Sequence, residues 1–145
     1  MANGQLSGQP PKCTQGCPTG WSFLASNKVC YKFFNVKKSY VNAAAECAKL
    51  SAVLAMPKTQ EQNDKVAAQR PGPKTNIWIG LSDTVTEGDF KWADGGSLDG
   101  WTNWKTKANL FKGKGCAMMQ AKWWDMKCTK PQPYVCQAPL AVLRA

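Results

Sequence analysis

Histidine is absent from this sequence, and only 9 of its 145 residues are aspartate or glutamate, against 19 lysines and arginines. Without histidine, the chain cannot form the Ser-His or Cys-His pairs that activate nucleophiles. It also has no glycine-rich phosphate loop, and Asp94 and Asp99 flank Gly95-Gly96 in a pattern typical of a turn and not of a catalytic carboxylate pair. These absences argue against catalysis.

Long hydrophobic runs are also missing. The apolar stretches are far shorter than the roughly 20 residues that cross a membrane, and Ala138–Leu143 is too short for an anchor. No apolar segment typical of a signal peptide stands at the start, and residues 1–12 have the polar, glycine- and proline-containing composition of a flexible leader. We therefore expect no membrane span, and the chain length predicts one domain.

Cysteine, by contrast, is abundant. The chain has 7 cysteines, and no two of them form a Cys-x-x-Cys pair. With no histidine to complete a zinc site, this usage favours disulfide bonds, which persist in oxidising compartments. The sequence therefore predicts a secreted, extracellular protein.

The stretch from Asn76 to Gly95 is central to the expected fold. Ile77–Leu81 is a short apolar run with β-branched and aromatic residues, followed at once by turn residues, which is typical of a strand buried on both faces. Phe90 and Trp92 then alternate with other residues, so a second strand would place both rings on one face. We expect this pair of strands to form the core.

Two helices are predicted before the central strand. Ser39 is a suitable N-cap for a helix over Tyr40–Leu50, and Thr59 with Gln62 forms a capping box for a second helix that Arg70–Pro73 ends. The apolar residues of the first helix recur at helical spacing and should share one face: Ala43, Ala44, Cys47 and Leu50.

Short strands are expected on either side of these elements. A strand pair between Trp21 and Phe34 would be stapled by a disulfide from Cys17 to Cys30. Further short strands are expected at 115–119, 122–128 and 134–136, around a long segment, Leu98–Lys130, with little regular pattern. Strands, two helices, then strands and a long loop indicate an α+β fold. Irregular segments this long are usually functional.

Positive charge is concentrated in the last third of the chain. Residues 101–145 hold 8 of the 19 lysines and arginines but only one acidic residue, Asp125. Ammonium groups interleaved with aromatic rings suit anionic polysaccharides and microbial envelope polymers. The alternative is a solvated loop whose lysines serve only solubility. Nucleic acid is not an expected partner, because a disulfide-rich extracellular protein rarely meets it.

Many landmarks along 17–137 together resemble a C-type lectin-like domain of the long form, which has an extra N-terminal disulfide hairpin. They are Cys17-Pro-x-Gly-Trp21, Cys30-Tyr31, Ala44, Cys47, Leu54-Ala55, Glu61-Gln-Asn63, Trp78-Ile-Gly-Leu81, Glu87-Gly-x-Phe-x-Trp92, Asp94-Gly95, Trp104, Cys116, Trp123-x-Asp125, Cys128 and Tyr134-Val-Cys136. The resemblance implies a disulfide-stapled α+β domain over 13–138, with two helices packed on small antiparallel sheets, a long irregular loop and a C-terminal tail over 139–145. It also implies the disulfides Cys17–Cys30, Cys47–Cys136 and Cys116–Cys128.

Sugar-binding members of that family hold a calcium ion in the long loop. Their ligands come from a Glu-Pro-Asn or Gln-Pro-Asp triplet, a further acid and a Trp-Asn-Asp motif, because calcium takes about six to eight oxygen ligands. Here the triplet is Lys107-Ala108-Asn109, the acid aligns with Lys114, and the motif is Trp123-Trp124-Asp125. Only Asn109 and Asp125 keep ligand chemistry. Because ammonium groups replace carboxylates, we expect no calcium, and no other cofactor, at the usual sugar site.

An auxiliary calcium position of the family is half kept. Asp83 and Glu87 match it, whereas its other acidic positions align with Leu110 and Gly115. Two carboxylates predict at most weak metal binding, and they could equally hydrogen-bond the turn in which they lie.

The implied disulfides use six of the seven cysteines and leave Cys13 over. An unpaired exposed thiol predicts a covalent dimer or a mixed disulfide, although Cys13 could instead replace Cys17 opposite Cys30.

The expected function is therefore calcium-independent recognition of anionic or microbial-surface glycans, as in innate immunity, by a basic, Trp-containing long loop. Trp123 is a core residue in the family, so Trp124 is the aromatic residue expected at the surface. The predicted ligand-binding residues are Lys105, Lys107, Asn109, Lys112, Lys114, Trp124 and Asp125. The alternatives are a protein-binding or assembly module without sugar binding and a mineral- or ice-surface binder.

Overall fold

The computed structural model describes residues 16–85, 88–98, 100–105 and 115–144. Its strands are β1 (Ser22–Leu24), β2 (Val29–Lys38), β3 (Val53–Leu54), β4 (Ile77–Ser82), β5 (Lys91–Trp92), β6 (Gly115–Met119), β7 (Trp123–Lys127) and β8 (Gln132–Pro139). Its helices are α1 (Tyr40–Ala48), α2 (Gln60–Ala68) and α3 (Leu140–Arg144). This arrangement confirms the α+β class. The predicted leader and Cys13 lie outside the described residues.

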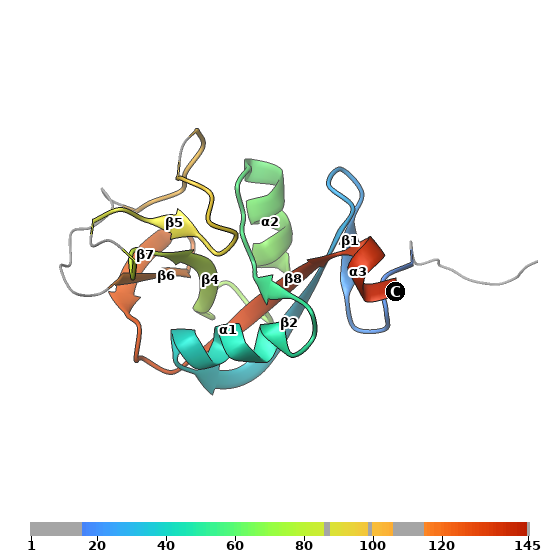
Figure 1. The fold of residues 1–145 in the computed structure, drawn as a ribbon, viewed down its shortest axis with the longest axis horizontal. Helices are drawn as coiled ribbons and strands as arrows, with labels where there is room; N and C mark the ends of the chain where they lie inside the picture. The colour runs from blue at the N-terminus through green and yellow to red at the C-terminus, as the bar shows by residue number, and fades with distance from the viewer. Residues whose placement is uncertain (1–15, 86–87, 99, 106–114, 145) are drawn as a thin grey trace, which may run out of the picture.

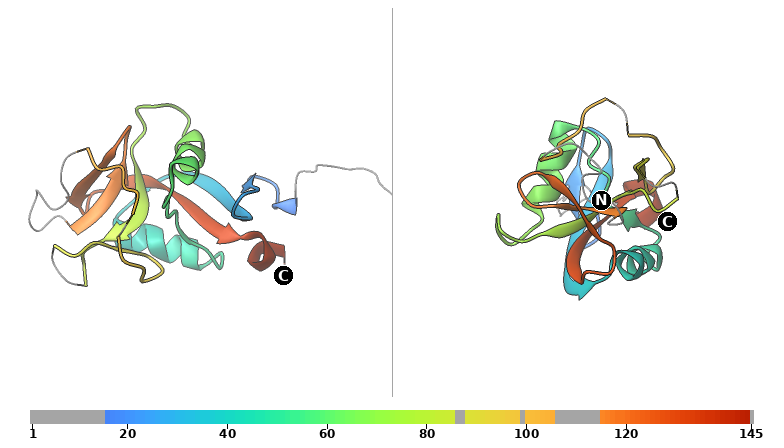
Figure 2. Two further views of the ribbon diagram at one scale, coloured as in Figure 1. Left: turned by 90° about the horizontal axis from the view of Figure 1, so that it is seen from above. Right: turned by 90° about the vertical axis from the view of Figure 1, so that its left-hand side faces the viewer.

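The strands join into one connected sheet in the order β1-β2-β8-β4-β6-β7, with β3 beside β8 and β5 beside β4. Neighbours are antiparallel except for β4 and β8, which are parallel at the pair Trp78 and Tyr134. This pairing joins the expected small antiparallel sheets. Both ends of the described chain lie beside β1 and α3, at the opposite end of the molecule from β5, β6 and β7 (Figures 1 and 2).

The central strand is buried as predicted. Every residue from Ile77 to Leu81 in β4 is fully buried, and Phe90 and Trp92 are both 4% exposed. Gly80 is required by a close approach, since a Cβ atom at this position would lie 2.6 Å from the carbonyl oxygen of Leu54. The apolar run thus forms a strand with backbone packed directly against one side.

Both helices begin at the predicted caps. The Ser39 hydroxyl accepts a hydrogen bond from the Asn42 amide, and the Thr59 hydroxyl accepts one from the Gln62 amide. The Gln62 side chain accepts from the Lys58 amide, one residue before the position that a capping box would use.

The prediction that Leu50 shares the buried face of the first helix is wrong. The helix α1 ends at Ala48, and Leu50 is 41% exposed, while Ala43 and Cys47 are fully buried. The chain turns just beyond the helix, where Ser51 has a φ of 60°. Helical spacing therefore no longer determines where the Leu50 side chain points.

Three disulfides staple the fold, and they confirm the pairs implied by the resemblance. Cys17 is bonded to Cys30, Cys47 to Cys136, and Cys116 to Cys128. The second of these joins α1 to β8 across 89 residues of sequence. Among the residues that the structure describes, no helix is long and apolar enough to cross a membrane.

Candidate ligand-binding face

The candidate face lies at the end of the molecule where β6 and β7 meet the segment 101–105 (Figure 1). Trp123 occupies the buried side of β7, with its ring nitrogen donating to the Asn63 side-chain oxygen at 2.8 Å. Three tryptophan rings contact Trp123 edge to face: Trp92, Trp101 and Trp104. The core role expected of Trp123 is confirmed, and its cluster fixes the position of β7.

Lys105 is placed beside Trp124 by backbone pairing. The Lys105 amide donates to the Trp123 carbonyl at 2.9 Å, and the Trp123 amide donates to the Asn103 carbonyl at 2.9 Å. The Lys105 ammonium then lies 5.1 Å from the centroid of the Trp124 ring, within the range of a cation–π contact. The structure thus brings together two of the predicted site residues.

Trp124 is half-buried, not fully at the surface as expected. Part of its ring packs against the cluster formed by α1, β4, β6 and β8, together with Met126. Because side chains alternate along a strand, Trp124 lies on the opposite face of β7 from Trp123. The ring is therefore anchored at one edge and presents the rest to the surface beside Lys105.

Asp125 does not share this face. It follows Trp124 on β7, points to the other side of the strand and is only 6% exposed. The sequence placed both residues in one site because they are adjacent in the motif, but strand alternation separates them. Lys107, Asn109, Lys112 and Lys114 lie outside the described residues.

Sequence reasoning missed Asn103, a polar residue of the same region. Its side-chain oxygen is 3.4 Å from the Lys122 ammonium, and its amide nitrogen donates to the Ala121 carbonyl at 3.3 Å. These contacts tie the segment before Lys105 to the turn between β6 and β7. No sequence pattern marks an asparagine as such a bridge.

The auxiliary metal position is used for turn formation. Asp83 is 8% exposed, and its Oδ2 accepts a hydrogen bond from the Gly88 amide at 2.7 Å. Its partner in the prediction, Glu87, lies outside the described residues. Within the ranges that the structure describes, no three cysteine, aspartate or glutamate side chains gather into a metal-binding group. The described donors fall short of the about six to eight oxygens that calcium takes, so calcium independence stays a prediction.

Comparisons with known proteins agree with this geometry. A family model described as the lectin C-type domain matches residues 36–138. An alpha-N-acetylgalactosamine-specific lectin from Patiria pectinifera is 30% identical, over 88% of this chain and 85% of its own. A snaclec protein from Philodryas olfersii, named as one of the subunits of its kind, is 31% identical, over 83% of this chain and 78% of its own.

Solved structures give the same result. A Ca2+-dependent type II antifreeze protein in its Ca2+-free form superposes with a TM-score of 0.76 at 27% identity, covering 84% of this chain and 99% of that protein.

Proposed function

Because this chain belongs to the C-type lectin domain family, we propose that it is a recognition module whose ligand is an anionic glycan. The relatives reported above are binding proteins by name, and the absence of histidine from the sequence removes the commonest general base. Binding without catalysis is therefore the function that the chain supports best.

The contact between Lys105 and Trp124 carries this proposal. An ammonium group held 5.1 Å from an indole centroid places a positive charge next to a flat apolar surface. A sugar ring can stack on such a surface while its sulfate, phosphate or carboxylate meets the ammonium group. The side chain of Trp124 is held in place by its half-buried edge, so little side-chain entropy is lost when a ligand binds.

Charge supports the same ligand class. The chain carries a formal net charge of +10, and its last 45 residues contain 8 of the basic residues and one acidic residue. An excess of one sign around a binding face attracts ligands of the opposite sign. We propose anionic polysaccharides and microbial envelope polymers as this class, bound by a secreted protein whose disulfides form in an oxidising compartment.

Calcium independence is part of the proposal. The positions that resemble the family's ligand set hold Lys107, Lys114 and Trp124, and the side chain of Asp83 already accepts a hydrogen bond in its turn. Positive charge at these positions opposes a dication. Binding should therefore persist when calcium is removed by a chelator.

The second candidate is a protein-binding or assembly module. It is favoured by the similarity to a snaclec protein whose name describes it as part of a larger assembly. An ice-surface binder is the third, because of the similarity to an antifreeze protein. A defined protein partner with a mostly apolar contact would favour the second candidate, and thermal hysteresis of ice growth the third.

An array of glycans and envelope polymers, screened with and without calcium, tests the proposal. We expect binding to heparin and to anionic envelope polymers that falls steeply as salt rises, because each ammonium contact with a polyanion releases counterions. Replacing Lys105, Lys107, Lys112 and Lys114 with glutamine should remove most of this binding and leave the fold intact. Calorimetry with calcium alone should show no high-affinity event.

The matched control is Lys49→Gln, because the Lys49 side chain is 70% exposed and follows α1, away from this face. It should bind as the parent does. If the four-lysine variant also bound as the parent does, the lysines would serve solubility and the protein-binding candidate would take precedence. A micromolar calcium site that disappears in Asp125→Ala would refute the calcium part of the proposal.

A further inference from the structure

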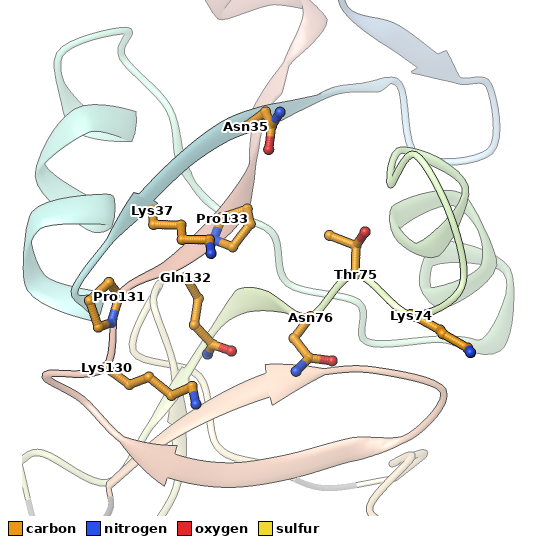
Figure 3. Close-up of a pocket in the computed structure, with 9 residues that line it drawn as sticks. All are labelled: Asn35, Lys37, Lys74, Thr75, Asn76, Lys130, Pro131, Gln132 and Pro133. Carbon is orange, nitrogen blue, oxygen red and sulfur yellow. The ribbon is translucent and has the colours of Figure 1, made fainter.

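We propose that this protein has a second binding site, for a hydroxylated anion such as a phosphorylated or sulfated sugar unit, in a pocket between β2, the segment 74–76 and the start of β8 (Figure 3). The pocket has a volume of about 360 Å³, and none of the residues that line it lies between 100 and 128. It is therefore separate from the face of Lys105 and Trp124 and does not rest on the function proposed for that face.

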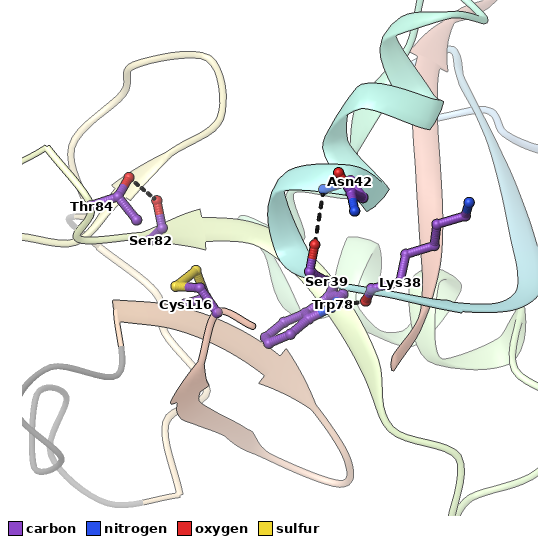
Figure 4. The surroundings of a disulfide bond; sticks show 8 residues. Lys38, Ser39, Asn42, Trp78, Ser82, Thr84 and Cys116 are labelled. Atoms are coloured by element: carbon purple, nitrogen blue, oxygen red, sulfur yellow. Dashed lines mark hydrogen bonds between the residues drawn. A yellow bond between two sulfur atoms is a disulfide. The ribbon is translucent and has the colours of Figure 1, made fainter. Parts of the chain in front are cut away.

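The pocket exists because β2 bulges away from β8. Phe34 pairs with Tyr134 and Lys38 with Gln132, so four residue steps on β2 span two on β8. Pro133 lies at the centre of this mismatch and has no amide hydrogen to donate to β2. Beyond the bulge, the Trp78 ring nitrogen donates to the Lys38 carbonyl at 2.8 Å and fixes the end of β2 against β4 (Figure 4).

The opposite wall is held by Arg70. Its guanidinium donates to the carbonyls of Pro73, Thr75 and Gln120, at distances from 2.8 to 3.3 Å. Burial lowers the pKa of Arg70, and these carbonyl oxygens replace the water that the guanidinium has lost. The segment that carries Lys74 and Asn76 is thereby tied to the turn after β6, so this wall of the pocket has a defined position.

Two amide side chains in the pocket have unused hydrogen-bonding atoms. Gln132 is 3% exposed, and its Nε2 has no partner, and neither has the buried Oδ1 of Asn76. In Figure 3 both amides turn into the space between β2, the 74–76 segment and the β7–β8 turn. Buried amide atoms without partners cost free energy, and water or a ligand can supply the missing bonds. A ligand oxygen can accept from Gln132, and a hydroxyl group can donate to Asn76.

Three lysines set the charge of the ligand. Lys37, Lys74 and Lys130 line the pocket and are exposed, and none of the described lining residues is acidic. None of the three has a carboxylate within salt-bridge distance among the described residues. Figure 3 shows Lys37 and Lys130 reaching toward the amides, while Lys74 extends along the rim. An anion with neighbouring hydroxyl groups satisfies the ammonium groups and the amides together.

The test is a titration of the whole chain with glucose 6-phosphate, glucose 6-sulfate, glucose and inorganic phosphate, followed by the side-chain amide signals of Gln132 and Asn76 in NMR spectra. We expect both signals to shift with either charged sugar, and to shift far less with glucose or phosphate alone. Lys37→Gln/Lys130→Gln should weaken binding at least about tenfold, because a hydrogen bond to a charged group contributes roughly 1.5 to 3 kcal/mol. Gln132→Met, which keeps the volume but removes the amide, should weaken it several-fold.

The matched control, Lys49→Gln/Lys105→Gln, removes the same charge and one lysine of the other face. It should leave glucose 6-phosphate binding unchanged while weakening polyanion binding, so the two proposals fail separately. Unshifted amide signals, or parental affinity in Lys37→Gln/Lys130→Gln, would overturn the second site. Phosphate binding as tight as glucose 6-phosphate would overturn the assignment of a hydroxylated ligand. The lysine variant keeps the proposal testable if Gln132→Met fails to fold.

Discussion

At the scale of single residues, the indole of Trp124 is placed to act through its surface and not through a charge. Trp124→Ala should weaken polyanion binding by about 1 kcal/mol while leaving the salt dependence nearly unchanged, since no ammonium group is removed. Trp124→Phe, which keeps an aromatic face beside Lys105, should recover most of the loss. Affinities measured at several salt concentrations check this, and a slope that falls with Trp124→Ala would contradict the stacking role.

Asp94 allows a prediction about pH. Its carboxylate accepts from the Lys58 ammonium at 2.6 Å and from the Gly96 amide at 2.8 Å, and these bonds hold the pKa of Asp94 below its usual value. The stabilisation is therefore present above the unfolded pKa of about 3.9 and is lost as pH falls through the folded one.

Asp94→Asn should then lower the free energy of unfolding at pH 7 by less than about 1 kcal/mol, because the pair is well exposed and screened by solvent. Denaturation in urea at a series of pH values measures this. The difference between the two proteins should shrink as the solution becomes acidic, and a difference that grew instead would contradict the assignment.

At the scale of elements, β4 depends on one missing side chain. In Gly80→Ala the new methyl group would lie against the Leu54 carbonyl, a backbone atom that cannot move without disturbing β3. We expect a loss of about 2 kcal/mol or more in the free energy of unfolding. The matched control is Gly72→Ala, since nothing lies within 4 Å of the added atom there, and it should change stability by less than about 1 kcal/mol. Equal effects in urea denaturation would refute the close approach.

The elements that sequence reasoning predicted correctly are those with local signals. Ser39 and Thr59 cap their helices with hydrogen bonds that span three residues, and the apolar run of β4 needs no knowledge of its partners. Leu50 failed because the helix ends before it. A periodic pattern does not show where a helix stops unless a cap or a proline marks the end.

The site was less predictable because it depends on pairing between distant strands. Trp124 and Asp125 are adjacent in the sequence, but they fall on opposite faces once β7 joins β6. The pocket at Gln132 arises from a register shift between β2 and β8, which are about 100 residues apart in sequence, so no local pattern announces it. Lysine composition indicated an anionic ligand but not a second place for one.

At the scale of the whole molecule, Cys13 decides the covalent state. The structure pairs Cys17 with Cys30, the arrangement that leaves Cys13 without an intramolecular cysteine partner, although Cys13 itself lies outside the described residues. We therefore expect a dimer or a mixed disulfide through Cys13, and a monomer for Cys13→Ser. Mass spectrometry of peptides from the non-reduced protein checks this. A bridge from Cys13 to Cys30 in a monomer would contradict both the pairing and the dimer.

The disulfide between Cys47 and Cys136 closes the longest loop of the fold, and on a chain-entropy estimate it contributes roughly 4 to 5 kcal/mol if native strain is small. The other two bridges each close a short loop on one side of the long segment. A protease that cut once between Lys105 and Gly115 would therefore produce two pieces joined by the Cys47–Cys136 bond alone. β4 in the first piece would still pair with β6 and β8 in the second. A nicked molecule would thus keep its mass on a non-reducing gel and separate only after reduction, so cleavage at this end of the domain need not release any part of it.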